Sequence, residues 1–483
     1  MMNADILQVL IELFQKKQFA KVLEIAAPIV DQNPVDINIL NIFGTAAAIT
    51  GQFQLAETTF KRALEMDSSN AELNNNLGNV FFQQKKYGDS LQYFEQAIKT
   101  QPKNCNSYNS LGMAMMLMDR IKDAEQVLNT SLMLEPKNPN THANIGALCW
   151  EKGCIKDAQK SCLAALSFNP DHAQAKLLLI RTFEAHSPDQ RVNLPTVVVN
   201  RKIREINLEK DIKKRLADSN VVKILQRAES ILTRHDLDIN YPESQAYRRD
   251  KTRLNCHRHE RIFDEHKIIP KFCFGCFKVQ VEPRNVFELI KLFLLFDWIN
   301  LAANNTRKCM VELRDEISGF YKGLIYCSSL EEAKLIHETI STHVSQLIDE
   351  EVPCSIKRGC SEFAKAIPEF GQIDKSGNVG LMEYVNEWEA IENDYDAHHK
   401  SDRPLRGAPT LRGFSLSDLL IIRNWVGYAH GIGDQSVADF SLDRVSSDRL
   451  LVAAKKRKAR MIPATQSKGM GHANYNIRPI NIG

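Results

Sequence analysis

The chain has 483 residues, more than the roughly 250 to 300 that a single hydrophobic core usually supports, so two or more domains are expected. Hydrophobic residues make up 43% and charged residues 25%. This ordinary globular composition excludes a disordered or collagen-like chain. The formal net charge is +3, from 62 basic and 59 acidic residues. The molecule as a whole is therefore not a polycation that would coat nucleic acid or anionic lipid.

The sequence predicts neither a membrane span nor export. The most apolar stretch, residues 286–303, contains Glu288, Lys291 and Asp297, so it falls short of the ~20 uncharged residues of a spanning helix. The first residues lack the basic and apolar segments of a signal peptide, and we expect a cytoplasmic protein. The eleven cysteines then predict reduced thiols or metal ligands rather than disulfides.

The first 172 residues repeat with a period of 34. In residues 71–104 the pattern is carried by Leu77-Gly78, Phe81, Phe94, Ala97 and Pro102. The equivalent residues of the next two units are Leu111-Gly112, Met115, Leu128, Ser131 and Pro136, then Ile145-Gly146, Cys149, Cys162, Ala165 and Pro170. A small residue such as Gly78 lets two helices approach closely, and the proline ends the second helix. Each helix pair leaves an apolar face that only the next pair covers, so the units are expected to stack into a superhelix.

This pattern resembles the tetratricopeptide repeat family over about residues 3–185, with residues 173–185 as a capping helix. The resemblance implies a concave groove, lined by the first helix of each repeat, that binds a protein or an extended peptide. An asparagine row there is similar to that of O-linked N-acetylglucosamine transferases; the alternative is that the asparagines only solvate an exposed helix. The predicted groove residues are Asn41, Asn75, Asn79, Asn109, Met113, Met116 and Trp150.

Residues 186–255 read as a linker followed by amphipathic helices. Next come two close pairs of metal-capable residues, Cys256 with His259 and Cys273 with Cys276. Two such pairs on separate knuckles supply the four ligands of a tetrahedral, structural zinc ion, as in a zinc ribbon. Two alternatives stay open: an iron–sulfur cluster held by the same thiolates, or four separately buried side chains.

The pattern of residues 277–360 predicts, in chain order, a strand, a helix, two strands, a second helix and a last strand. This order is that of a ferredoxin-like sheet within an α+β region spanning residues 256–400. The first strand lacks the aromatic residues of RNA-recognition domains, so nucleic-acid binding is disfavoured. The face of the sheet that is expected to be exposed instead carries charged residues, namely Lys278, Glu282, Glu312, Lys322 and Lys357. One interpretation is that they form a small-molecule pocket. Cys360, near Lys357 and Arg358, is a weak candidate nucleophile.

Residues 401–483 predict a helical extension and a basic, partly disordered tail that contains the run 455–460. Just before them, Asp394, Asp396 and His398 group metal-capable side chains at helical spacing. They are weak catalytic candidates, because a solvated helix end is the preferred interpretation.

We therefore expect a multidomain scaffold that binds a protein or peptide through its repeats and carries a Cys-rich α+β domain. The first alternative is an enzyme, a transferase or a metal-dependent one, that modifies the recruited peptide or carrier protein. The second is RNA binding through the basic tail. No complete catalytic motif decides whether a reaction occurs.

Overall fold

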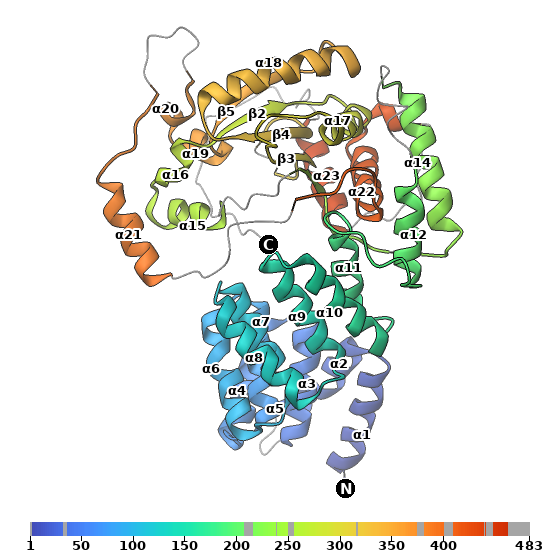
Figure 1. The fold of residues 1–483 in the computed structure, drawn as a ribbon. Coiled ribbons are helices and arrows are strands. Elements are labelled where there is room, and N and C mark those ends of the chain that lie inside the picture. Colours follow the sequence, from blue (N-terminus) through green and yellow to red (C-terminus); the bar gives the residue numbers. More distant parts are fainter. Residues whose placement is uncertain are drawn as a thin grey trace, which may run out of the picture.

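The computed structural model describes residues 2–31, 36–206, 216–237, 239–249, 256–314, 317–373, 381–399, 409–438, 440 and 448–461. An all-helical array forms the lower part of the molecule in Figure 1, and a region built on a five-stranded sheet forms the upper part. Among the described residues, no helix is both long enough and apolar enough to cross a membrane.

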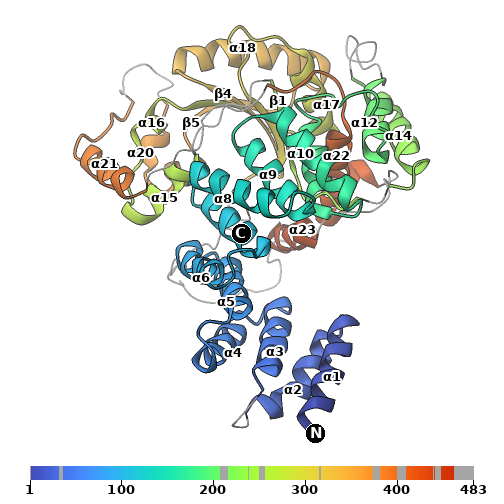
Figure 2. The ribbon, with the colours of Figure 1, turned by 60° about the horizontal axis from the view of Figure 1, so that its bottom comes forward.

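The array consists of five helix pairs that follow the predicted 34-residue units. They are α1 (Met2–Gln15) with α2 (Phe19–Val30), α3 (Ile37–Ile49) with α4 (Phe53–Met66), α5 (Ala71–Gln83) with α6 (Tyr87–Thr100), α7 (Cys105–Leu117) with α8 (Ile121–Leu134), and α9 (Pro139–Glu151) with α10 (Ile155–Phe168). The capping helix α11 (Ala173–Thr182) follows. Figure 2 shows the pairs placed one after another from the N-terminus toward the sheet. The predicted helical repeat superhelix is confirmed.

A polar side chain begins the first helix of successive units at intervals of one repeat. Asp36, Asn70, Asn104, Asn138 and His172 each accept a hydrogen bond from a backbone N–H in the first turn of the helix that follows. Such acceptors satisfy backbone donors that have no partner within the helix. The repeat therefore fixes where each first helix starts as well as which residues pack inside it.

Glycines in the first helices allow the close approach within a pair. A Cβ on Gly78 would lie 2.6 Å from Cε1 of Phe94, and one on Gly112 would lie 2.7 Å from Cγ of Leu128. Both neighbours are fully buried. The predicted pairing of a small residue with a large one is thus the actual contact between the two helices.

The C-terminal region contains an antiparallel sheet with the strand order β1-β3-β4-β2-β5. The strands are β1 (Gln245–Arg248), β2 (Phe277–Val281), β3 (Arg307–Val311), β4 (Tyr321–Cys327) and β5 (Cys354–Arg358). Helix α17 (Val286–Trp298) lies between β2 and β3 in the chain, and α18 (Leu330–Leu347) lies between β4 and β5. The elements after residue 276 occur in the predicted order, but edge strand β1 was not predicted.

Three helices cover one face of the sheet. Helix α18 contacts β5, β2 and β4, α17 contacts β4 and β3, and α22 (Leu416–Ile432) contacts β3 and β1. A Cβ on Gly323 of β4 would lie 2.3 Å from Leu292, so α17 packs directly against the strand backbone. Helices α12 (Pro195–Arg204) and α14 (Asp218–Thr233) pack outside this layer against α22 and α17.

The remaining elements lie beyond one end of the sheet, or beside α22. Helices α15 (Cys256–His266), α16 (Lys271–Phe274), α19 (Ser361–Ala366), α20 (Pro368–Gly371) and α21 (Trp388–His398) gather near β5 at the left of Figure 1. The short 3-10 helix η1 (Gln435–Val437) follows α22, and α23 (Asp448–Met461) packs against α22.

One hydrophobic core crosses the boundaries predicted at residues 185, 255 and 400. It includes Ala143 and Phe183 from the end of the repeat array, Phe293 from α17, and Trp425 and Ala454 from the C-terminal helices. Trp425 is fully buried and its indole Nε1 donates to the carbonyl oxygen of Ser244, at a distance of 2.8 Å. The helix predicted as an extension is therefore a central element of the C-terminal core.

Candidate functional site

The predicted groove row is partly exposed and is linked by hydrogen bonds between repeats. Asn41 of α3 donates from Nδ2 to Oε1 of Glu72 (2.8 Å) and accepts at Oδ1 from Nδ2 of Asn76 (2.8 Å), both on α5. One repeat further on, Asn79 accepts from Oγ of Ser110 on α7 (3.3 Å). These bonds run along the row of first helices and hold consecutive repeats in register.

Two further residues of the row, Asn75 and Met113, are partly exposed. Oδ1 of Asn75 is itself a buried atom and has no hydrogen-bond partner in the described part of the chain. A buried amide oxygen without a partner is unusual, because buried polar atoms are nearly always hydrogen-bonded.

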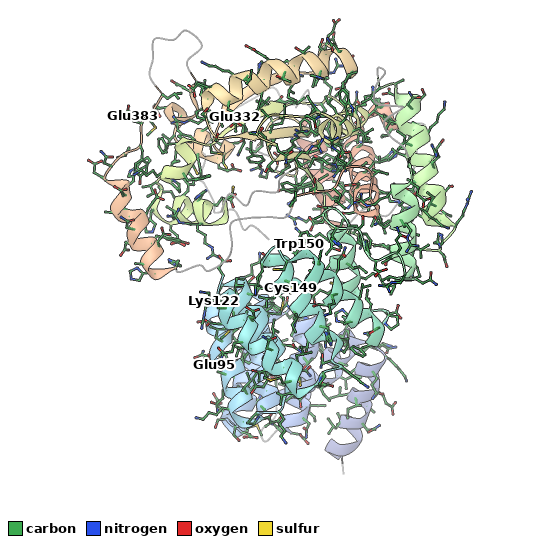
Figure 3. All side chains as sticks on the ribbon, in the orientation of Figure 1. Glu95, Lys122, Cys149, Trp150, Glu332 and Glu383 are labelled. Carbon is green, nitrogen blue, oxygen red and sulfur yellow. The ribbon has the colours of Figure 1, made fainter. Side chains whose placement is uncertain are left out.

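The other three predicted groove residues are buried. Asn109 is 6% exposed and accepts from Oγ of Ser131 on α8, and Met116 is 4% exposed. Trp150 is 7% exposed, and the guanidinium of Arg181 lies over its ring, 5.0 Å from the centroid. Figure 3 shows Trp150 at the end of the array nearest the C-terminal region. The capping helix thus covers Trp150, which was predicted to line the groove.

The predicted zinc ligands are not assembled as a four-ligand site. Within the described ranges, no group of three or more His, Cys, Asp or Glu side chains is placed to hold a metal ion. The ring of His259 stacks on Phe272 with centroids 5.2 Å apart, and burial followed by the charge of Arg258 lowers the pKa of His259 to about 4.

One thiol of this set, Cys273, packs in an apolar cluster with Ile269, Phe363 and Phe370. Burial raises the pKa of the Cys273 and Cys276 thiols, and raises that of Cys256 to about 11. Cys273 also interacts electrostatically with Cys256, Cys276 and Cys360, so these thiols are neighbours, and a structural metal ion stays a prediction.

The acidic and histidine candidates of α21 do not converge on one site. Asp394 and His398 project into solvent with side chains 74% and 70% exposed, with Nδ1 of His398 3.6 Å from Oδ1 of Asp394. Asp396 instead pairs with Arg258, whose Nε lies 2.7 Å from Oδ1 of Asp396. Asp396 therefore joins α21 to α15, as a structural ion pair would.

The basic run of α23 is partly used inside the protein. Arg457 is 7% exposed. Its Nη2 donates to the carbonyl oxygens of Ile317 (3.0 Å) and Gly319 (2.7 Å), and its guanidinium lies over the ring of Phe320. This residue anchors a loop and is not available to RNA, and residues 462–483 lie outside the described ranges.

The face of the sheet opposite α17 carries a lysine cluster, which we call the lysine face. The strand register places Lys278 of β2 directly between Tyr326 of β4 and Lys357 of β5. Side chains alternate along strands, so Gln280 and Lys322 belong to the same face. Two of the lysines are almost fully buried: Lys278 is 5% exposed and Lys322 is 4% exposed.

Within the described segments, one of these two buried cations pairs with a carboxylate. Nζ of Lys322 lies 3.0 Å from Oε2 of Glu312. Nζ of Lys278 instead donates to the carbonyl oxygen of Gly359 (3.0 Å) and lies 3.6 Å from Sγ of Cys360.

Lys357 has a similar environment. Its Nζ donates to Oγ of Ser361 (2.7 Å). Burial, followed by the charges of Lys278 and Lys322, lowers the pKa of Lys357 to about 8. The ammonium groups of Lys278, Lys322 and Lys357 therefore repel one another in surroundings with little access to solvent.

The structure adds two residues to this face. Lys308 of β3 and Tyr247 of β1 join it, with Nζ of Lys308 5.7 Å from the centroid of the Tyr247 ring. Tyr247 was missed because β1 was not predicted; the alternation of Gln245-Ala-Tyr-Arg248 was the available signal. Lys308 lies in a predicted strand, and its alternation with Glu312 could have found it. Arg358 lies on the opposite face, buried against the rings of Phe274, Phe277 and Phe370.

Comparison with known proteins bears on the N-terminal part alone. A family model described as tetratricopeptide repeat matches residues 43–104. No curated protein sequence matches the chain. Together with the helix pairs and their 34-residue period, the family match defines the first 185 residues as a tetratricopeptide-repeat array; the rest of the chain is not recognised.

Several solved structures overlap with this part of the chain. PilF of Pseudomonas aeruginosa is 19% identical, with 37% of this chain and 82% of that chain covered and a TM-score of 0.34. TTC0263, a thermophilic TPR protein of Thermus thermophilus, is 16% identical, with 37% and 98% covered and a TM-score of 0.34. MamA of Desulfovibrio magneticus is 18% identical, with 35% and 96% covered and a TM-score of 0.31. TM-scores this low do not bear on function.

Proposed function

We propose that the protein is a scaffold whose repeat array binds an extended segment of a partner protein along the first helices of repeats two to four. The observation that carries this proposal is the partly exposed row of amides, in which Asn41 and Asn79 are held by bonds between repeats while the buried Oδ1 of Asn75 has no partner among the described residues. Amides held in this way bind a peptide backbone at little further entropic cost.

The test uses the whole chain and a random peptide display library. Enriched peptides would be measured by fluorescence anisotropy against Asn75→Ala and Asn79→Ala. We expect at least tenfold weaker binding for the double variant. The matched control is Asn129→Ala, an exposed asparagine on the second helix of its repeat, which should leave affinity unchanged. Peptides that bind the double variant as tightly as the parent chain would refute the groove assignment.

We also infer that β2 to β5 with α17 and α18 form a ferredoxin-like unit, extended by β1. The strand order β3-β4-β2-β5 and the antiparallel pairing of every neighbour support this. A structural zinc ion at Cys256, His259, Cys273 and Cys276 stays a prediction. Elemental analysis of the purified protein tests it, with less than 0.1 metal ion per chain as the refuting result.

The alternative function, an enzyme that modifies the recruited segment, keeps one supporting observation. Nζ of Lys278 lies 3.6 Å from Sγ of Cys360, and reactive cysteines are commonly found next to a cation. Labelling with iodoacetamide tests it: the alternative requires Cys360 to react faster than the exposed Cys154 at pH 7.

A further inference from the structure

The lysine face has more positive charge than the described residues neutralise. Lys278, Lys308 and Lys357 have no carboxylate within 4.0 Å in the part of the chain that the structure describes. Of these three lysines, Lys278 is the one that is almost fully buried, and its Nζ lies against the thiol of Cys360 and the ring of Tyr326. Burying an ammonium group without a carboxylate beside it costs several kcal/mol by general estimate. Such an arrangement is stable when an anion shares the site.

A second, independent feature on the same face points to a ligand. Gln280 is 9% exposed, and its Oε1 has no hydrogen-bond partner among the described residues. Its amide nitrogen donates to Glu282, which fixes the orientation of the amide. Buried polar atoms are nearly always paired, so this oxygen is placed to accept from a group that the protein itself does not supply.

We propose that the lysine face binds a small phosphate ester. The phosphate oxygens accept from Lys278 and Lys357, and a hydroxyl or amine of the same ligand donates to Oε1 of Gln280. Each ammonium group has three N–H donors. Lys357 uses one on Ser361, and Lys278 uses two on Gly359 and Cys360, so both retain a donor for the ligand.

The charge and burial of the face favour a phosphate ester over other anions. A phosphate monoester is close to doubly charged at neutral pH, which matches two ammonium groups, whereas a carboxylate neutralises only one. A nucleic-acid strand fits poorly because Lys278 is almost fully buried. The aromatic rings that could stack on bases, Tyr326 and Tyr247, already lie under Lys278 and Lys308.

Isothermal titration of the full-length protein tests the proposal. The probes are glycerol 3-phosphate, adenosine monophosphate and inorganic phosphate, with glycerol as the uncharged control. We expect both esters to bind more tightly than inorganic phosphate, since only they carry both a phosphate group for the lysines and a separate hydroxyl or amine that can reach Gln280, and glycerol not to bind at millimolar concentration. Failure of both esters to bind at 10 mM would overturn the proposal.

Matched variants locate the site. Lys357→Gln should weaken ester binding at least tenfold, and Lys357→Arg should retain most of it because the charge remains. Lys334→Gln, the same change at an exposed lysine of α18, should have no effect. Equal weakening by Lys357→Gln and Lys334→Gln would show only general charge attraction and would overturn the site.

The pH dependence supplies a readout that a purely structural role would not change. Lys357 faces Lys278, Lys322, Cys360 and Arg314, and a bound phosphate would favour its charged form. Affinity should therefore be constant from pH 7 to 8 and fall up to tenfold for each pH unit above 8. Lys357→Arg should lose this fall, because arginine stays charged. An equal fall in the parent chain and in Lys357→Arg would overturn the role of Lys357. This outcome is independent of the repeat array, so the two proposals fail separately.

Discussion

The contact between Gly78 and Phe94 allows a quantitative test of how the repeats pack. In Gly78→Ala, the new methyl group would lie 2.6 Å from Cε1 and 2.7 Å from Cδ1 of the Phe94 ring. Phe94 is 0% exposed, so its ring cannot move into solvent. Overpacking of this kind costs about 1–3 kcal/mol, and replacing a helical glycine by alanine returns about 0.5–1 kcal/mol. We expect a net destabilisation of about 1–2 kcal/mol.

Gly88 provides the matched control in the adjoining helix. It is exposed, and a Cβ there would meet nothing within 4 Å. Gly88→Ala should therefore stabilise the protein by up to about 1 kcal/mol. At Gly146 the nearest side-chain atom, Sγ of Cys162, is 3.1 Å away, and Gly146→Ala should fall between the two.

Hydrogen–deuterium exchange measured by mass spectrometry would give the local opening free energy of α5 and α6 in the Gly78 and Gly88 variants, and of α9 and α10 in Gly146→Ala. The expected order of stability is Gly88→Ala, then the parent chain and Gly146→Ala, then Gly78→Ala. Equal protection of α5 and α6 in Gly78→Ala and Gly88→Ala would show that the close approach does not exist.

Three further predictions concern charges in the C-terminal region. Arg248 is 3% exposed and pairs with Asp418 (Nη2 to Oδ2, 2.8 Å) and Asp297 (Nε to Oδ1, 3.0 Å). Arg248→Met leaves these two buried carboxylates without this cation and should lower the free energy of unfolding in urea by about 3–5 kcal/mol. An unchanged unfolding midpoint would contradict this. Burial alone would raise the pKa of Glu312, but its bonds to Arg314 and the charges of Arg314 and Lys322 outweigh burial and lower it to about 2. The contribution of Glu312 to stability is therefore complete above pH 4.5 and is lost as the pH falls toward 2, by up to about 3 kcal/mol. Glu312→Gln should flatten the plot of stability against pH in this range. Identical plots for the variant and the parent chain would refute the assignment. Lys357, with its pKa lowered to about 8, should be acetylated at pH 8 in preference to exposed lysines. Because the folded protein disfavours its charged form, the protein should be less stable below pH 8 than at pH 10. Competitive labelling that gives Lys357 a titration midpoint above pH 10 would contradict both expectations.

The repeat array could be read from the sequence because its contacts are local. Gly78 meets Phe94 sixteen positions later, and the cap at Asn70 acts on the turn that follows it. Every such contact recurs at the same spacing, so a period in the sequence is also a period in the structure. The order of strands and helices between residues 277 and 358 was predicted for a related reason, since alternation and helical periodicity are properties of short segments.

The tertiary structure alone decided which distant segments share a core or a site. Strand β1 has four residues and pairs with β3, which begins 59 positions after β1 ends, and no local pattern specifies such a partner. The burial of Trp150 beneath Arg181 and of α22 between α17 and β1 depends on how the repeat cap packs against the sheet region. The lysine face arises in the same way: strands β2, β3, β4 and β5 each contribute one lysine that looks like an ordinary surface residue, and only the register places Lys278 between Tyr326 and Lys357. Residue type and spacing specify the elements, but the free energy of burying charge depends on which elements meet.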